Sequence, residues 1–300
     1  MKLANQVAIV TGGGRGIGEA TSLAMAGEGA RLVLAARTLS EVQQVAERII
    51  AGGGAAVAVA ADVSQPDQVA RLVEAALRSF QQVDILVNCA GVYGPIGRLW
   101  ELNGEEWRRA LEVNVYGTFL CCQAVLPHLI ARRRGSIINF SGGGAAAPLP
   151  RFSAYGTSKA AVVRLTETLA EEVRELGITV NAIAPGAVNT RLQDAVLEAG
   201  ERAGDLLGRI ERLRQTGEGG VPPELAARLA VFLASEDAAG LTGKLIAAPY
   251  DGWESWDRRQ VEEWMRLPWF TLRRLDRLTL RPFLESRTAP KPQMNADERR

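Results

Sequence analysis

Residues 7–18 read Val7-Ala8-Ile9-Val10-Thr11-Gly12-Gly13-Gly14-Arg15-Gly16-Ile17-Gly18, and no other segment says more about the fold. Val7–Val10 is a short, continuous apolar run, which is typical of a strand buried on both faces of a parallel sheet. A glycine-rich turn follows, and then a helical pattern from Glu19 to Gly29. Glycines let the backbone approach a pyrophosphate, and a helix N-terminus offers it free N–H groups. The segment therefore predicts a dinucleotide site rather than a plain loop, with contacts from Gly12, Arg15, Gly16, Ile17 and Gly18.

Further strands and helices alternate along the chain. Apolar runs predict six more strands, at 31–36, 55–61, 84–87, 136–140, 178–183 and 241–247. Helical patterns lie between them, at 39–50, 66–80, 103–133, 152–175 and 222–235, and Pro127 should kink or break the third of these. This alternation predicts an α/β, Rossmann-like, doubly wound parallel sheet of seven strands, with three layers in a single domain.

The bulk composition excludes several classes of protein. The 300 residues carry a net charge of +1 and are 47% hydrophobic, which gives no electrostatic reason to expect nucleic acid or an anionic membrane as a partner. No apolar run reaches the length of a membrane span, and no secretory signal precedes the first strand. Three cysteines, two of them adjacent, suggest reduced thiols and a cytoplasmic protein. His128 is the single histidine and has no second ligand nearby, so no metal site is predicted.

The end of the second strand favours NADP(H) over NAD(H). In NAD-preferring folds an acidic residue at this place bonds the ribose hydroxyls. Here Ala36 takes that place and Arg37 follows it, so a guanidinium is available to pair with a 2′-phosphate. Arg15 adds a second positive charge.

Residues that follow other strands are further cofactor candidates, because the carboxyl ends of parallel strands meet at one edge of the sheet. Asp62 is placed to accept a hydrogen bond from an adenine amino group, although it is equally suited to cap a loop. The other candidates from these strand ends are Val63, Asn88, Ala90, Gly91, Pro185, Gly186, Val188 and Thr190. Residues 191–215 are polar and helical, and we expect them to cover a substrate.

Tyr155 and Lys159 lie one helical turn apart in the segment that follows the fifth strand, so both side chains leave the same helix face. A neighbouring ammonium stabilises a phenolate, so we expect Lys159 to lower the Tyr155 pKa and fit the phenol for acid/base work on an alcohol or carbonyl oxygen. Asn114 lies in an apolar stretch, where it is either a satisfied core amide or part of a proton relay that holds a water near Lys159.

In this order and spacing the motifs resemble those of the short-chain dehydrogenase/reductase family over residues 5–250. The matching residues are Thr11, Gly12, Gly16, Gly18, Asp62, Asn88, Ala90, Gly91, Asn114, Tyr155, Lys159, Pro185 and Gly186. The resemblance implies a Rossmann fold, a nicotinamide cofactor, a Ser/Tyr/Lys/Asn catalytic set and a homodimer or homotetramer. In that family the lysine also binds the nicotinamide ribose and the serine orients the substrate oxygen.

The serine position departs from the family pattern. The family's serine lies 13 residues before the tyrosine, where this chain has Gly142, whereas Ser141 lies 14 residues before it. Either the glycine-rich loop lets Ser141 take the role or the hydroxyl is missing, and we favour Ser141.

The C-terminus is a second departure, because nearly fifty residues follow the place where the family usually ends. We expect residues 1–250 to be the dinucleotide-binding and catalytic domain, 251–288 a tryptophan-rich extension and 289–300 a disordered tail. The extension either packs on its own domain or a neighbouring subunit, which we favour, or forms a wall of the substrate pocket.

These observations predict an NADP-preferring oxidoreductase that moves a hydride between NADP(H) and a small-molecule alcohol or carbonyl substrate. Tyr155 would be the general acid/base, with Lys159, Ser141 and Asn114 in supporting roles. The alternative is a regulatory or scaffold protein that binds NAD(P) without turnover. An epimerase or dehydratase is disfavoured by the Gly12/Gly16/Gly18 spacing.

Overall fold

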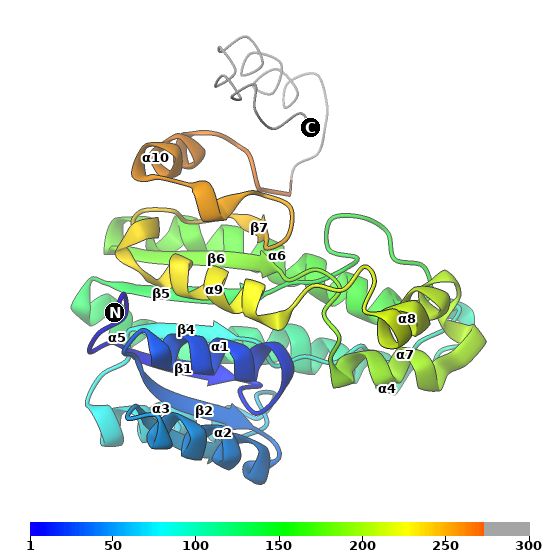
Figure 1. Ribbon diagram of the computed structural model, residues 1–300, viewed down its shortest axis with the longest axis horizontal. Coiled ribbons are helices and arrows are strands. Elements are labelled where there is room, and N and C mark those ends of the chain that lie inside the picture. Colours follow the sequence, from blue (N-terminus) through cyan, green and yellow to red (C-terminus); the bar gives the residue numbers. More distant parts are fainter. Residues whose placement is uncertain (273–300) are drawn as a thin grey trace.

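The computed structural model describes residues 1–272 and shows a three-layer α/β domain built on a seven-stranded parallel sheet (Figure 1). The strand order is β3-β2-β1-β4-β5-β6-β7, which confirms the predicted doubly wound architecture. The strands are β1 (Val7–Thr11), β2 (Arg31–Ala36), β3 (Ala55–Ala60), β4 (Ile85–Asn88), β5 (Gly135–Phe140), β6 (Ile178–Ala184) and β7 (Leu245–Ala247).

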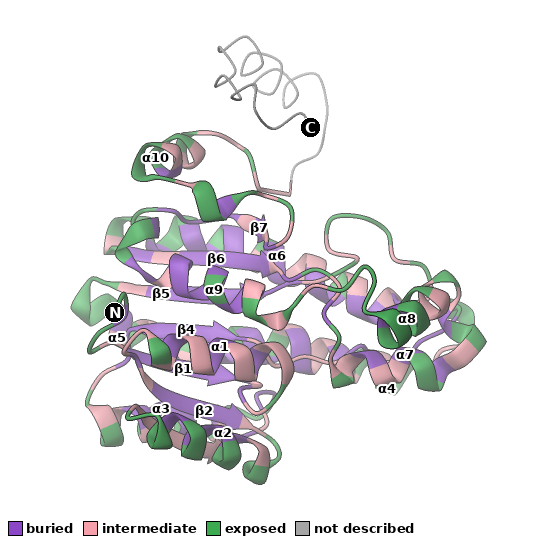
Figure 2. Cartoon of the chain, viewed as in Figure 1, coloured by how far each residue is buried: buried purple, intermediate pink, exposed green. Residues whose placement is uncertain are grey.

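Helices cover both faces of the sheet, and the strands between them are largely buried (Figure 2). One face packs on α1 (Gly16–Gly27), α2 (Leu39–Ala51) and α9 (Pro223–Ala234). The other packs on α3 (Pro66–Phe80), α5 (Gly117–Arg132) and α6 (Ser153–Val173). This double cover explains why the strands read as continuous apolar runs instead of alternating patterns.

Helices α4 (Gly104–Leu111), α7 (Asp194–Ala199) and α8 (Asp205–Thr216) lie beyond the carboxyl ends of the strands (Figure 1). Residues of α7 and α8 belong to a third, smaller apolar cluster. The segment 191–215, predicted to be helical, is divided into α7, α8, which ends at Thr216, and the short 3₁₀ turns Arg191–Gln193 and Gly200–Ala203. Gly200 and Gly204 have positive φ, which separates these pieces. The remaining 3₁₀ turns are Leu99–Glu101, Arg174–Leu176, Glu236–Ala238 and Trp253–Ser255.

Two local predictions are corrected. The helical segment at 104–132 runs through Pro127 and instead widens into a π-helical turn at Glu112–Tyr116, where the Asn114 side chain bonds the Val92 backbone. This segment is long and apolar enough to cross a membrane, but half of its most apolar window is buried inside the domain, as in a core helix. The seventh strand is shorter than predicted, because Gly243 adopts positive φ just before Leu245.

The C-terminal extension packs on the domain as far as the structure describes it. Helix α10 (Arg258–Arg266) lies beyond β7 (Figure 1). Its Val261 and the neighbouring Trp253, Trp256 and Trp264 belong to the apolar cluster that also contains α9 and Ile246 of β7. Phe232 of α9 meets the rings of Trp253 and Trp256, with centroids 5.7 and 6.5 Å away. The Phe270 carbonyl accepts a hydrogen bond from the Leu245 N–H, so the extension occupies the free edge of β7. The predictions for residues 273–288 and for the tail 289–300 lie outside the described residues.

Candidate active site

The glycine turn between β1 and α1 has the geometry of a phosphate cradle. Gly12 and Gly16 have φ of +66° and +55°, a region that disfavours other residues. A Cβ on Gly18 would overlap the Gly12 carbonyl oxygen, so the turn closes only with glycine there. Helix α1 starts at Gly16, three residues before the predicted start at Glu19, and its N-terminus faces a cavity lined by the turn. The cradle that the sequence predicts is therefore present.

Charged residues at the outer end of this cavity form an ion-pair cluster that the sequence did not reveal. Glu41, from the first turn of α2, pairs with Arg15 at 3.5 Å and with Arg191 at 3.0 Å. Arg37 lines the same cavity and is exposed, and no ion pair or hydrogen bond links its side chain to another group within residues 1–272. A carboxylate thus stands beside the cradle after all, but Arg15 and Arg191 neutralise it and Arg37 remains available.

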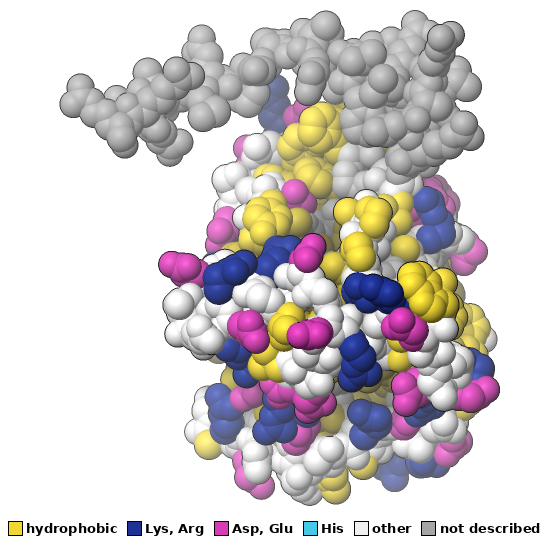
Figure 3. Space-filling model, turned by 90° about the vertical axis from the view of Figure 1, so that its right-hand side faces the viewer, with side chains coloured by type: hydrophobic (Ala, Val, Ile, Leu, Met, Phe, Trp, Pro, Cys, Tyr) yellow, Lys and Arg dark blue, Asp and Glu magenta, His cyan; other side chains and the backbone are white. Residues whose placement is uncertain are grey.

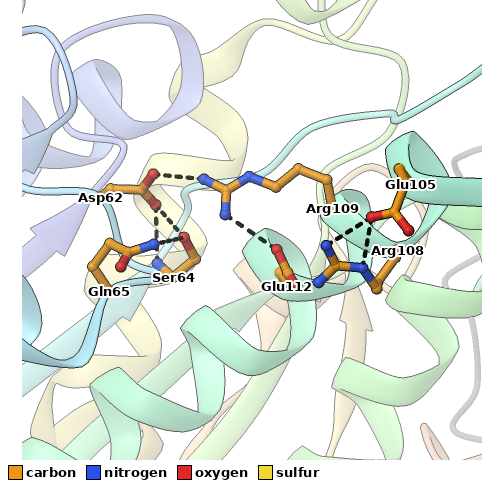
Figure 4. A network of polar contacts seen from close by, with 7 residues as sticks. All are labelled: Asp62, Ser64, Gln65, Glu105, Arg108, Arg109 and Glu112. Carbon is orange, nitrogen blue, oxygen red and sulfur yellow. Dashed lines mark hydrogen bonds and ion pairs between the residues drawn. The ribbon is translucent and has the colours of Figure 1, made fainter.

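Asp62 follows β3 and belongs to a polar network with α4 (Figure 4). Its carboxylate accepts bonds from the Ser64 hydroxyl at 2.6 Å and from the Arg109 guanidinium at 2.7 Å, and Arg109 also pairs with Glu112. Burial acts to raise the Asp62 pKa, but the Ser64 bonds and the Arg109 charge outweigh it and hold that pKa below its usual value. Asp62 and Val63 both line the cradle cavity, where the adenine acceptor was predicted.

Residues at the end of β4 and in the loop after it differ in placement: some line the cavity, and one points into the interior of the domain. Cys89, Ala90 and Gly91 line the cavity, and Thr11 Oγ1 accepts hydrogen bonds from the Cys89 and Ala90 N–H groups at 3.2 and 3.3 Å. The Asn88 side chain instead turns inward and donates to Asn139 Oδ1 at 2.9 Å. The structure therefore places Asn88 as a link between β4 and β5 and not as a lining residue of either cavity described here.

Asn114 is a buried, well-bonded amide. It accepts from the Val92 N–H at 2.9 Å and donates to the Val92 carbonyl at 2.8 Å and to Ser158 Oγ at 2.9 Å. Both amide hydrogens are thus in use, so the side chain fastens the loop after Gly91 to α6. A Cβ on Gly91 would lie 3.4 Å from Lys159 Nζ, and glycine there keeps the front of the lysine open.

Tyr155 and Lys159 lie side by side on the first turns of α6, both almost fully buried. Lys159 Nζ donates to the Phe140 carbonyl at 2.8 Å and lies 5.6 Å from the centroid of the Tyr155 ring. Burial raises the Tyr155 pKa above its ordinary value and lowers the Lys159 pKa to about 8. The predicted lowering of the tyrosine pKa is therefore wrong for this state, because desolvation outweighs an ammonium that is turned toward a carbonyl.

The position 13 residues before Tyr155, where a serine is expected, is Gly142 and carries no side chain. A Cβ on Gly142 would overlap the Tyr155 hydroxyl oxygen, so the phenol fills the space that a side chain at 142 would take. Ser141 continues the sheet by donating its N–H to the Ile183 carbonyl at 2.8 Å. Its Oγ is buried and has no hydrogen-bond partner within the described part of the chain.

A second cavity, of about 370 Å³, adjoins the first and contains Tyr155, Lys159, Ser141 and Gly142. The two cavities share Ile17, Cys89, Gly91, Thr190 and Leu192, so the cradle leads directly to the tyrosine. The second cavity is also lined by three predicted cofactor contacts that follow β6: Pro185, Gly186 and Val188. Gly186 has a φ of +81°.

Tyr93 and Gln193 lie in segments that the sequence predicts to shape the pocket, but their hydrogen-bonded pairing was not predicted. The Tyr93 hydroxyl donates to Gln193 Oε1 at 3.1 Å, and its ring centroid is 4.6 Å from that of Tyr155. Burial raises the Tyr93 pKa to about 12, so this phenol stays protonated at neutral pH. Its position two residues after Gly91 was an available signal, but nothing in the sequence pairs it with Gln193.

Comparison with known proteins agrees with this geometry. Residues 6–200 match the family described as short chain dehydrogenase. The short-chain reductase protein NovJ of Streptomyces niveus is 37% identical over 80% of this chain and 91% of its own length. The 3-oxoacyl-(acyl-carrier-protein) reductase FabG of Thermotoga maritima is 32% identical over 82% of this chain and 97% of its own.

A solved structure described as NAD⁺-bound xylitol dehydrogenase superposes with a TM-score of 0.77 at 26% identity. The superposition covers 82% of this chain and 98% of that one. With this fold, the glycine cradle and the Tyr155–Lys159 pair, the chain belongs to the short-chain dehydrogenase/reductase family of NAD(P)-binding oxidoreductases.

Proposed function

We propose that this protein is an NADP(H)-preferring carbonyl reductase or alcohol dehydrogenase with Tyr155 as its general acid/base. The observation that carries the proposal is the continuity of the two cavities, because it sets the buried phenol and amine at the end of a dinucleotide cradle. The test is consumption of NADPH over a panel of aldehydes and ketones, with Tyr155→Phe as the inactive comparison.

The residues present fit a nicotinamide dinucleotide. Glycines form a turn that no Cβ could enter at Gly18, and the α1 N-terminus supplies N–H groups for a pyrophosphate. Gly91 leaves the space before Lys159 open for a ribose. When bound, the cofactor would donate or accept the hydride.

The chain's own residues then manage the proton and the position of the substrate oxygen. Because burial keeps Tyr155 a neutral phenol, its O–H is ready to donate to a carbonyl oxygen as that oxygen gains negative charge, which suits the reductive direction. Lys159 Nζ would hold the ribose hydroxyls and balance the charge left on the phenolate. The apolar walls and the cover at 191–216 would keep water from the reacting atoms.

Arg37 supports the preference for NADP(H). Of the cations that line the cradle, Arg15 is already paired with Glu41, whereas Arg37 has no ionic partner within residues 1–272. We expect Arg37→Asp to weaken NADPH binding by about ten- to a hundredfold, because a charge-assisted pair to the 2′-phosphate is lost and a repulsion is added.

Calorimetric titration with NADPH and NADH measures this effect, and NADH, which lacks the phosphate, is the internal control. A wild-type protein that binds both cofactors equally, or a variant that leaves their ratio unchanged, would contradict the assignment.

The Lys159 pKa predicts a pH limit on cofactor capture. Burial lowers this pKa from its ordinary 10.5 to about 8, so the ammonium is present below that pH and is lost above it. We expect kcat/KM for NADPH, which reports the free enzyme, to fall as the pH rises through about 8. Lys159→Arg should abolish this fall in kcat/KM at high pH, since a guanidinium stays charged. A wild-type profile that is flat across this range would rule out the role.

Because Gly142 stands where a serine is expected, one competing function is favoured: a protein that binds NAD(P) but catalyses no reaction with it. That protein would bind NADPH tightly yet consume none with any carbonyl compound. The predicted cytoplasmic location and homodimeric or homotetrameric state remain predictions.

A further inference from the structure

The cavity around Tyr155 is polar at its base, apolar along its walls and cationic at its mouth. Tyr155 and Lys159 lie at the base, and the walls include Leu149, Leu206 and Ile210. Two of its lining residues are charged, Lys159 and Arg209, and both are cations. No carboxylate lines this cavity within the described part of the chain, so its interior charge has one sign.

The outer surface does not share this bias. The face at the carboxyl ends of the strands shows Lys and Arg side chains interspersed with Asp and Glu (Figure 3). The net charge of the whole protein is only +1. Selection of a charged substrate must therefore come from groups in the cavity, and the field of the whole protein contributes little.

Arg209 is an uncommitted cation. It lies on α8 and is exposed, and no hydrogen bond or ion pair engages its side chain within residues 1–272. Asp205 lies one helical turn before it, and Glu218 lines a small adjoining cavity with it, but neither forms an ion pair with it in the described part of the chain.

Three other arginines of the cover are engaged by groups of the protein. Arg191 pairs with Glu41, Arg214 pairs with Asp194, and Arg202 donates to the Ala199 carbonyl. Lys159 is likewise in use, because its ammonium donates to the Phe140 carbonyl at the base of the cavity. Arg209 is thus the lining cation that a substrate can reach from the mouth.

We propose that the substrate is a carbonyl compound that carries a carboxylate, and that Arg209 selects it. The carbonyl end lies at Tyr155, an apolar segment lies along Leu206 and Ile210, and the carboxylate meets the guanidinium at the mouth. A planar guanidinium pairs with a carboxylate through two parallel hydrogen bonds, which gives orientation as well as affinity. This inference rests on the proposed reductase function and deepens it.

Matched keto acids and methyl esters test the inference: laevulinate and 5-oxohexanoate, each against its methyl ester, with NADPH at saturation. We expect wild-type kcat/KM to favour the acid over the ester by about tenfold at low salt, as for a partly exposed charged hydrogen bond. Arg209→Gln should bring the ratio near unity, and Arg209→Glu should invert it. Added salt should lower the wild-type ratio, which a purely structural role for Arg209 would not produce.

Arg212→Gln is the matched control. Arg212 lies on the same helix and is also exposed, but it lines only the adjoining cavity and not the one that holds Tyr155. Its loss removes the same charge and should leave the acid-to-ester ratio unchanged. A ratio that favours the ester in the wild type, or that survives in Arg209→Gln, would overturn the inference.

A binding measurement separates this inference from the proposed function. Hexanoate and hexanamide have no reducible ketone or aldehyde and differ in charge, so calorimetry on the NADPH-loaded protein reads recognition without chemistry. If hexanoate binds more tightly and Arg209→Gln removes the difference, the carboxylate site holds even where no carbonyl compound is reduced. Equal binding of the two would rule out the carboxylate site, and the proposed reduction of neutral carbonyl compounds would still stand.

Discussion

Replacing Tyr155 by phenylalanine is expected to lower carbonyl turnover by about a hundredfold to ten-thousandfold, the contribution of a positioned general acid. The phenol oxygen lies in the cavity that continues from the glycine cradle, and burial keeps it protonated and able to donate. Phenylalanine keeps the ring contact with Tyr93 but removes the proton. NADPH oxidation under saturating carbonyl substrate measures the loss.

Two comparisons make this result decisive. The affinity of Tyr155→Phe for NADPH, measured by fluorescence titration, should stay within a few-fold of wild type, which separates lost chemistry from lost binding. Ser141→Ala tests the serine assignment: full turnover in that variant, with turnover abolished in Tyr155→Phe, would show that Ser141 does not orient the substrate. Turnover retained in Tyr155→Phe would reject the proposed mechanism altogether.

Replacing Gly18 by alanine is expected to destabilise the protein by about 3 kcal/mol and to weaken NADPH binding by about tenfold to a hundredfold. A Cβ at this position would overlap the Gly12 carbonyl oxygen, so the turn and the first residues of α1 must move. That movement displaces the N–H groups that would bond a charged pyrophosphate, each worth about 1.5–3 kcal/mol. Thermal unfolding and calorimetric titration measure the two effects.

Gly27→Ala is the control for this experiment. Gly27 lies in the same helix, but a Cβ there would meet nothing within 4 Å. The same chemical change should therefore be neutral or stabilising by up to about 1 kcal/mol, since alanine has the higher helix propensity. Equal losses in both variants would indicate a general effect on α1 and not a specific one on the cradle.

The architecture was predictable because its signals are local. A strand buried on both faces reads as an apolar run, and glycines mark a turn, so β1, the cradle and α1 follow from one segment. The widened turn at Glu112–Tyr116 was not predictable, because it comes with a tertiary contact between Asn114 and Val92 that no local sequence pattern reports. Pro127 carries a strong local signal, yet the helix continues through it.

In the candidate site, too, features set by local sequence were predictable and features set by tertiary contacts were not. Tyr155 and Lys159 are one turn apart, so helix geometry alone brings them together. Glu41 and Arg191 are 150 residues apart in sequence, and Tyr93 and Gln193 are 100 apart, and no pattern in the chain announces either pair. The direction of the Tyr155 pKa shift also depends on burial, which a sequence motif does not report.

The C-terminal segment covers the outer edge of β7, the last strand of the sheet. The Phe270 carbonyl takes up the Leu245 N–H, and Lys244 Nζ donates to the carbonyls of Leu267 and Trp269. An outermost strand normally exposes such backbone groups and can recruit a strand from another molecule. Here the chain's own continuation occupies part of that border, so a strand from another molecule could pair with β7 only by displacing this segment.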